Sequence, residues 1–310
     1  MAEILYLDQN AWVSLARGAW DKERHPQDYT RLVKVVEALQ NKRYIVPLSF
    51  ANIYETLKIN DPSRRANMAQ TQVTISQGKV FRSRRRILSD TLTAYLADKF
   101  EIAHEALDDR WFLSDLWFEA VADYTPSTFG FALSSAFLEQ VLSNPAGMLF
   151  DFLTAGEEEV RLSGVRSFSA ASSELIAEIE RRRAIAASEN LAFRKRAYGA
   201  RLIIDEFDFI LATGQRLGLD WRNVGDIGSS LVRSIPVDIP ILAAERELAI
   251  RLEDQGKSIV ENDLRDMSAF TTTLPLADIV IGEKTFINLA RQAGLGKAFS
   301  TRLLTSIDGL

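Results

Sequence analysis

Two short apolar runs, one near each end of the chain, constrain the fold more than any other feature. Residues 4–7 read Ile-Leu-Tyr-Leu and are followed by Asp8. Residues 279–281 read Ile-Val-Ile and are followed by Gly282 and Glu283. Short runs that are apolar on both faces are typical of strands buried inside a parallel sheet. We therefore predict an α/β fold, with a parallel β-sheet flanked by helices.

A second strand candidate near the N-terminus supports this prediction. Residues 44–48 are mostly apolar, and Pro47 indicates that this strand lies at a sheet edge or ends early. Residues 29–40 carry an apolar stripe at helical spacing between the two strands. A strand, a helix and a second strand form a βαβ unit, in which the strands are parallel.

The middle of the chain has a different pattern. Residues 87–234 show helical spacing and no convincing strand, and one of the predicted helices covers residues 114–121. We therefore predict one parallel α/β domain, made of residues 1–86 and 235–310 and interrupted by an all-α insertion over 87–234. The predicted breaks within the insertion fall at Pro126, Pro145, Gly156 and Gly164.

The composition limits the chemistry that this chain can perform. It contains no cysteine and only two histidines, which excludes cysteine nucleophiles and disfavours sites built on histidine. With 37 basic and 42 acidic residues the formal charge is −5, so nucleic acid could be held only by a local basic patch. We expect a cytoplasmic protein, because no run approaches the ~18 apolar residues of a membrane span and no basic signal-peptide start is present.

Five acids lie where a parallel sheet would collect them at one edge. Asp8 and Glu283 follow the two buried strands. Glu55 lies in the helix after the second strand, and Asp263 and Asp266 share a face of the helix before the late strand. Carboxylates gathered there repel one another unless a cation neutralises them, and their oxygens suit Mg²⁺ or Mn²⁺. The alternative is chance placement, since the chain has 42 acids.

Asp278 is a lesser candidate for the same site. It begins the late strand instead of ending it, so it lies ~13–16 Å from the far edge at the usual rise per residue. We interpret Asp278 as a structural acid that accepts backbone hydrogen bonds.

Several motifs resemble those of PIN and PIN-like nucleases. Residues 6–10, Tyr-Leu-Asp-Gln-Asn, resemble the opening strand of that family. Residues 49–55 resemble its second acidic motif, and residues 266–286 resemble its last one. Residues 262–266, together with 274–278, look more specifically like large bacterial PIN-like proteins. The order and spacing of these motifs carry the resemblance, which covers the two ends of the chain.

The resemblance implies a metal-dependent endoribonuclease that acts as a toxin or defence effector, with an antitoxin or regulatory protein as partner. It places Asp8, Glu55, Asp266 and Glu283 in the catalytic set. Asp8 and Glu283 would anchor Mg²⁺ or Mn²⁺, Glu55 and Asp266 would complete the shell or position water, and Asp263 would support the ligands. The residues expected to orient ligands or cap helices are Asn10 and Ser49.

A basic stretch follows Glu55. Residues 58–86 contain eight Lys and Arg against one acid, Asp61. Beside an acidic metal site these side chains could hold phosphates, whereas the alternative is a solvated helix face with surface ion pairs. The residues predicted to bind nucleic acid are Arg64, Arg65, Arg82, Arg84, Arg85 and Arg86.

Two other functions remain open at this stage. The first is a structure-specific DNA nuclease that uses the same acids, since acids alone cannot recognise a 2′-hydroxyl. The second is a non-catalytic scaffold or binding protein, in which the helical block is an interaction surface. Binding of Mn²⁺ by the acids would separate an enzyme from a scaffold. The oligomeric state is open too, a homo-oligomer included.

Overall fold

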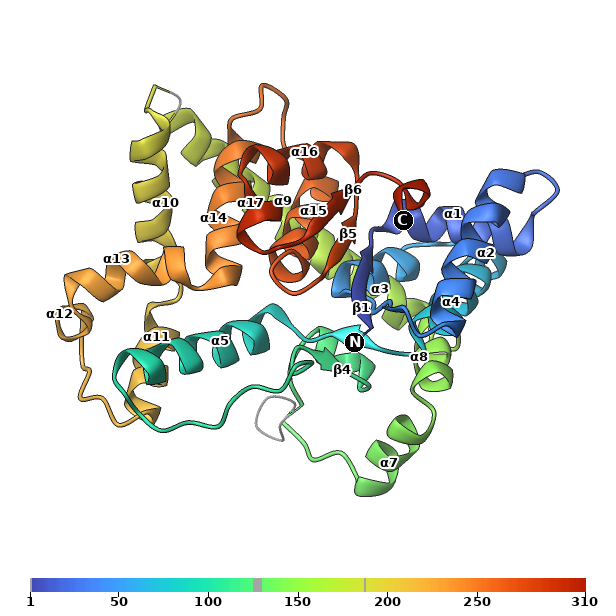
Figure 1. Cartoon of the computed structure of the whole chain (residues 1–310), viewed down its shortest axis with the longest axis horizontal. Helices are drawn as coiled ribbons and strands as arrows, with labels where there is room; N and C mark the ends of the chain where they lie inside the picture. Colours follow the sequence, from blue (N-terminus) through green and yellow to red (C-terminus); the bar gives the residue numbers. More distant parts are fainter. Residues whose placement is uncertain (1, 125–129, 187) are drawn as a thin grey trace.

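The computed structural model describes residues 2–124, 130–186 and 188–310. In this part of the chain four parallel strands form one sheet in the order β2-β1-β5-β6 (Figure 1). The predicted α/β class is confirmed, and helices make up most of the chain. The strands of the sheet are β1 (Glu3–Leu7), β2 (Tyr44–Ile45), β5 (Ile279–Ile281) and β6 (Arg302–Leu304).

The helices form two groups along the chain. Those that come from its two ends are α1 (Gln9–Trp20), α2 (Pro26–Gln40), α3 (Phe50–Leu57), α4 (Pro62–Ser76), α14 (Pro240–Glu253), α15 (Glu261–Thr273), α16 (Lys284–Gln292), α17 (Leu295–Ala298) and the 3₁₀ turn η2 (Ile307–Gly309). Those of the middle are α5 (Arg84–Lys99), the 3₁₀ turn η1 (Trp117–Ala120), α7 (Ser135–Ser143), α8 (Pro145–Thr154), α9 (Glu158–Ala186), α10 (Leu191–Asp205), α11 (Phe207–Arg216), α12 (Val224–Ile227) and α13 (Ser229–Asp238). Within the described residues, none of these helices is long and apolar enough to cross a membrane.

The strand order reverses between β1 and β5. The chain leaves β1 through α1 and α2 to reach β2, and it leaves β5 through α16 and α17 to reach β6 on the other side. Figure 1 shows the blue helices and the orange and red helices on opposite sides of β1. Because Leu7 pairs with Ile281, the next residues leave the sheet side by side at its carboxyl edge. Open α/β sheets bind ligands at this kind of switch point.

Two strands outside the main sheet were not predicted from the sequence. Val80–Phe81 (β3) pairs antiparallel with Leu113–Ser114 (β4), and Leu48 bridges Val80 in parallel. The helix predicted over 114–121 is therefore wrong, because this segment begins in β4 and continues into η1. Buried Glu119 accepts a hydrogen bond from Ser114 Oγ at 2.6 Å, which holds the segment in this form.

The predicted breaks have different outcomes. Pro145 begins α8 and Gly156 lies between α8 and α9, so these two are confirmed. Gly164 lies inside α9, so the break predicted there is wrong. Pro126 lies outside the described residues.

The helical middle and the sheet share one hydrophobic core. The ring of Tyr6 in β1 packs edge-on against Phe81 and against Phe270 of α15, with ring centroids 6.1 and 6.4 Å apart. The same buried cluster contains Leu92 of α5 and Leu202 of α10. The division into a domain of residues 1–86 and 235–310 and an insertion of 87–234 stays a prediction.

Candidate active site

Asp8 lies at the carboxyl end of β1 and caps α1. Its backbone N–H donates to the carbonyl of Ile281 at 2.9 Å, and its Oδ1 accepts the backbone N–H of Ala11 at 2.9 Å. The residue is only 7% exposed. Burial raises the pKa of Asp8 to about 6, the N–H of Ala11 opposes this shift, and the charge of Glu283 adds to it.

Glu283 lies beside Asp8 at the same edge, as predicted. It follows β5, precedes α16 and is exposed. Both acids line a cleft of about 250 Å³, together with Asn10 and Lys284. Asp278 lies at the opposite edge, where its Oδ2 accepts the backbone N–H of Ile4 at 2.7 Å, so the predicted strand boundary is confirmed.

Asp266 approaches these acids from α15. The residue is half-buried, and in the described chain its carboxylate has no hydrogen bond or ion pair. Burial, followed by the charges of Asp8, Glu283 and Glu55, raises the pKa of Asp266 to about 8. The charges of the other three predicted catalytic acids therefore all act on Asp266, although the four acids come from elements far apart in sequence.

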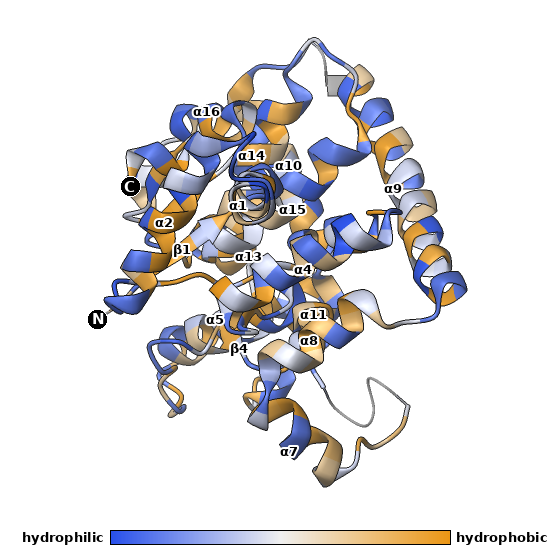
Figure 2. Cartoon of the chain, turned by 90° about the vertical axis from the view of Figure 1, so that its right-hand side faces the viewer, coloured by the Kyte–Doolittle hydropathy of each residue, from blue (hydrophilic) through white to orange (hydrophobic). Residues whose placement is uncertain are grey.

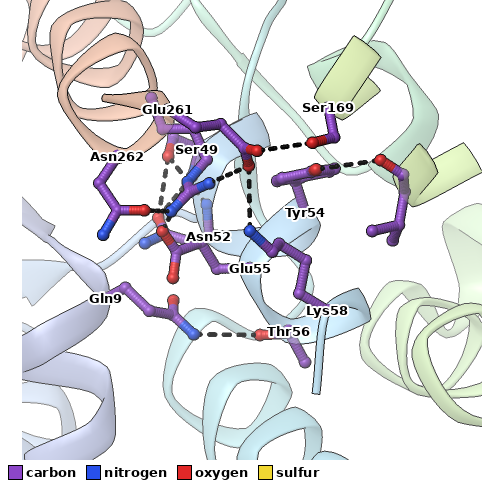
Figure 3. A network of polar contacts seen from close by, with 12 residues as sticks. Gln9, Ser49, Asn52, Tyr54, Glu55, Thr56, Lys58, Ser169, Glu261 and Asn262 are labelled. Atoms are coloured by element: carbon purple, nitrogen blue, oxygen red, sulfur yellow. Dashed lines mark hydrogen bonds and ion pairs between the residues drawn. The ribbon is translucent and has the colours of Figure 1, made fainter. Parts of the chain in front are cut away.

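Glu55 differs from the other three because a cation already neutralises it. Arg265, which is only 5% exposed, donates from Nε to Glu55 Oε1 at 2.8 Å. The same guanidinium contacts Glu261 and Asn262, and Lys58 Nζ lies 3.0 Å from Glu261 Oε1. Figure 3 shows Glu55, Lys58, Glu261 and Asn262 in this network of polar contacts.

A buried hydrogen-bond network connects α3 to the end of β1 beside the site. Ser49 caps α3, as predicted, and forms a reciprocal capping box with Asn52. Asn52 Nδ2 also donates to the carbonyl of Leu7 at 3.2 Å, which ties α3 to the end of β1. The hydroxyl of Tyr6 lies 3.5 Å from Ser49 Oγ, and burial and the charges of nearby acids raise its pKa.

Sequence reasoning missed three residues of this site, namely Tyr6, Asn52 and Arg265. For Asn52 the sequence offered only Ser49, a preferred N-cap residue, because the usual capping-box partner three residues later is Glu or Gln. No local signal existed for Tyr6 and Arg265. Their roles depend on neighbours contributed by other elements.

Asp263 does not join the other acids, and the role predicted for it is wrong. Its Oδ2 accepts the backbone N–H of Val260 at 3.0 Å, and its Oδ1 accepts from Lys257 Nζ at 2.9 Å. Because α15 begins at Glu261, Asp263 lies in its first turn, where a carboxylate satisfies free backbone N–H groups. Asn10 is exposed beside Asp8, and its backbone N–H lowers the pKa of that acid.

Five of the six arginines predicted to bind nucleic acid form ion pairs within the chain, which favours the alternative of ion pairs for them; their binding of nucleic acid stays a prediction. Arg84 pairs with both Glu206 and Glu245 at 2.7 Å, which connects α5 to the junction of α10 and α11 and to α14. The other four arginines form five ion pairs: Arg65 with Glu158, Arg82 with Glu119, Arg85 with Glu206, and Arg86 with Asp90 and Asp123.

Arg64 is the exception among the six. It is exposed, and in the described chain its side chain has no ion-pair partner. It lines a cleft of about 500 Å³ that also contains Glu55. Lys284, in the cleft of Asp8 and Glu283, is likewise exposed and unpaired within the described residues.

The carboxylate oxygens of this site are suitable ligands for a hard divalent cation, although they are not arranged around a single position. Asp8, Asp266 and Glu283 offer carboxylate oxygens without a counter-charge, which is the chemistry that Mg²⁺ or Mn²⁺ requires. Among the residues described, no group of three or more acids or histidines is arranged to hold a metal ion. Glu55 could join such a shell only by leaving Arg265.

Searches of protein-family models, of curated proteins and of solved structures find no match for this chain. The function therefore has to be inferred from the residues at the carboxyl edge of the sheet.

Mn²⁺ is expected to raise the Tm of the chain more at pH 8 than at pH 5. Asp8 and Asp266 have folded pKa values of about 6 and 8, above the ordinary 3.8, so protonation favours the folded state. Their stabilising contribution is complete below pH ~4 and is lost as the pH rises through both folded values. Mn²⁺ competes with protons for the carboxylates of Asp8 and Asp266, so it stabilises the folded chain most when both acids are ionised. Thermal unfolding with and without Mn²⁺ measures this, and an equal shift at both pH values contradicts it.

Proposed function

We propose that this chain is a PIN-like, Mg²⁺- or Mn²⁺-dependent nuclease that hydrolyses RNA. The observation that supports the proposal best is the shared cleft of Asp8 and Glu283 at the switch point of the parallel sheet, together with the effect of both charges on the pKa of Asp266. A bound divalent ion would supply an activated water and a positive charge beside the phosphodiester. The order of the acids along the chain and the parallel sheet support the PIN-like assignment.

The residues of the chain itself would have distinct roles in this reaction. Asp8 and Glu283 would hold the ion from the ends of β1 and β5, and Asp266 would complete the set from α15. The α1 cap keeps the carboxylate of Asp8 in one orientation. Lys284 and Arg64, both exposed and without ion-pair partners in the described residues, would bind phosphates on either side of the acids.

The non-catalytic alternative also has an observation in its favour. Arg265 neutralises Glu55 without any metal, and the described residues contain no closed set of three ligands. A scaffold would keep this arrangement and would show no acid-dependent binding of Mn²⁺. Roles as a toxin or defence effector, and an antitoxin partner, stay predictions.

Glu283→Gln is expected to lower Mn²⁺-dependent cleavage of single-stranded RNA by at least about 100-fold, because several kcal/mol of metal-based stabilisation are lost. Asp278→Asn is the matched control on the other end of the same strand, and it should cleave at the wild-type rate. Cleavage is measured on labelled RNA and on DNA of the same sequence. An inactive Asp278→Asn with an active Glu283→Gln contradicts the proposed metal shell, and cleavage of DNA alone favours the DNA nuclease.

A further inference from the structure

We propose that the cleft between α3, α8 and α9 is a binding site for a neutral, apolar small molecule. This cleft has a volume of about 640 Å³, which lies within the range of ~300–1,000 Å³ that is usual for small-molecule sites. It shares no lining residue with the clefts that contain Asp8, Glu283 and Glu55. The apolar side chains that form most of its lining are Phe50, Tyr54, Leu57, Phe152, Val160 and Phe168.

Three aromatic rings form one wall of this cleft. The ring of Phe168 lies 4.2 Å from that of Tyr54 and 5.7 Å from that of Phe50, measured between centroids. The hydroxyl of Tyr54 is already used, because it donates to the carbonyl of Val165 at 3.3 Å (Figure 3). The wall therefore offers ring surface, which favours a ligand with a flat, apolar face.

The two arginines that line the cleft already have partners within the chain. Arg161 bonds the carbonyl of Leu57, the carboxylate of Glu158 and Asn60 Oδ1. Arg65 donates to the carbonyl of Ile59 at 2.7 Å and pairs with the same Glu158. The acids that line the cleft, Asp151 and Glu157, are exposed to water. These contacts favour a neutral ligand over an anion or a cation.

Gly164 indicates that the cleft is kept open. It lies inside α9, where glycine weakens a helix, and a Cβ built on it would meet no atom within 4 Å. Packing therefore does not require glycine at this position. Gly214 of α11 is the contrast, since a Cβ there would lie 2.1 Å from the ring of Trp221. A larger residue at 164 would occupy the space that we assign to the ligand.

Figure 2 shows α9 as a separate column at one side of the molecule, with hydrophobic residues along its length. Val160, in its first turn, is 67% exposed, and Phe152 of α8 is 37% exposed. Solvent-exposed apolar side chains beside an aromatic wall are energetically unfavourable in the free chain. Binding of an apolar molecule would cover them, which is the source of the affinity that we expect.

Titration of the full chain with Nile red, a neutral apolar dye, tests the proposal. The expected result is saturable binding of one dye, with blue-shifted emission. Gly164→Leu should weaken this binding at least 10-fold and leave the Tm equal or higher. Gly256→Leu is the matched control, since a Cβ there also meets no atom within 4 Å and Gly256 lies outside the cleft; it should bind as the wild type does.

Three results would overturn the proposal. The first is absent or non-saturable dye binding, and the second is unchanged binding by Gly164→Leu. The third is an occupant of another kind, shown by displacement of the dye by single-stranded RNA or by a dimer that Gly164→Leu dissociates. Should Gly164→Leu not fold, Val160→Arg at the exposed mouth provides the same test. The dye is read without any cleavage assay, so the outcome is independent of the proposed nuclease activity.

Discussion

Asp266→Asn is expected to abolish Mn²⁺-dependent cleavage of RNA and, at the same time, to stabilise the metal-free chain at pH 8. The carboxylate of Asp266 is half-buried among three other acids, which raises its pKa to about 8. Its ionised form therefore disfavours the folded state, and a neutral amide of the same shape removes that repulsion. We expect a gain of about 1–3 kcal/mol in the free energy of unfolding at pH 8, and none at pH 4, where the acid is protonated.

Two readouts have to move in opposite directions for this prediction to hold. Cleavage should fall by at least about 100-fold, as for a lost metal ligand, while urea denaturation at pH 8 shows the higher stability. Asp263→Asn, three residues earlier in α15, is the matched control, because Asp263 caps the helix and faces Lys257. It should cleave normally and be no more stable than the wild type. Loss of both activity and stability in Asp266→Asn would instead indicate a structural acid.

Arg84→Met is expected to lower the free energy of unfolding by about 1–3 kcal/mol, the usual cost of removing a hydrogen-bond partner from a buried charged group. Arg84 contacts both Glu206 and Glu245 at 2.7 Å, and Glu206 is only 5% exposed. Without the guanidinium, Glu245 loses its partner and Glu206 retains only Arg85, which is 57% exposed. Urea denaturation measures the loss.

Arg64→Met is the matched control for Arg84→Met. Its side chain is exposed and has no ion-pair partner in the described residues, so stability should change by less than about 0.5 kcal/mol. Binding of single-stranded RNA should weaken, with a salt dependence shallower by about 0.7 for the lost phosphate contact. A stable Arg84→Met would contradict the structural role that we assign to Arg84. An unchanged salt dependence in Arg64→Met would contradict phosphate binding by Arg64.

Strands with strong local signals could be predicted from the sequence. Residues 4–7 and 279–281 are apolar on both faces, and the structure places them in the centre of the sheet. Because parallel strands present their carboxyl ends at one edge, the proximity of Asp8 and Glu283 followed from these two runs alone. The opposite placement of Asp278 followed from the same boundary. Short strands without such a signal, β3 and β4, were missed because distant pairing alone stabilises them.

The pairing of charges was decided only by the tertiary structure. Arg265 and Glu55 are 210 residues apart, and Arg84 and Glu245 are 161 apart, so no local pattern relates them. The sequence by itself determined the two central strands of the sheet and the acids that follow them. Both are local properties, because a strand is recognised from a short apolar run and the next residue along the chain lies at its carboxyl end. Whether an arginine is free to bind phosphate depends on which distant carboxylate the fold brings within about 3–4 Å of it, the range over which an ion pair forms.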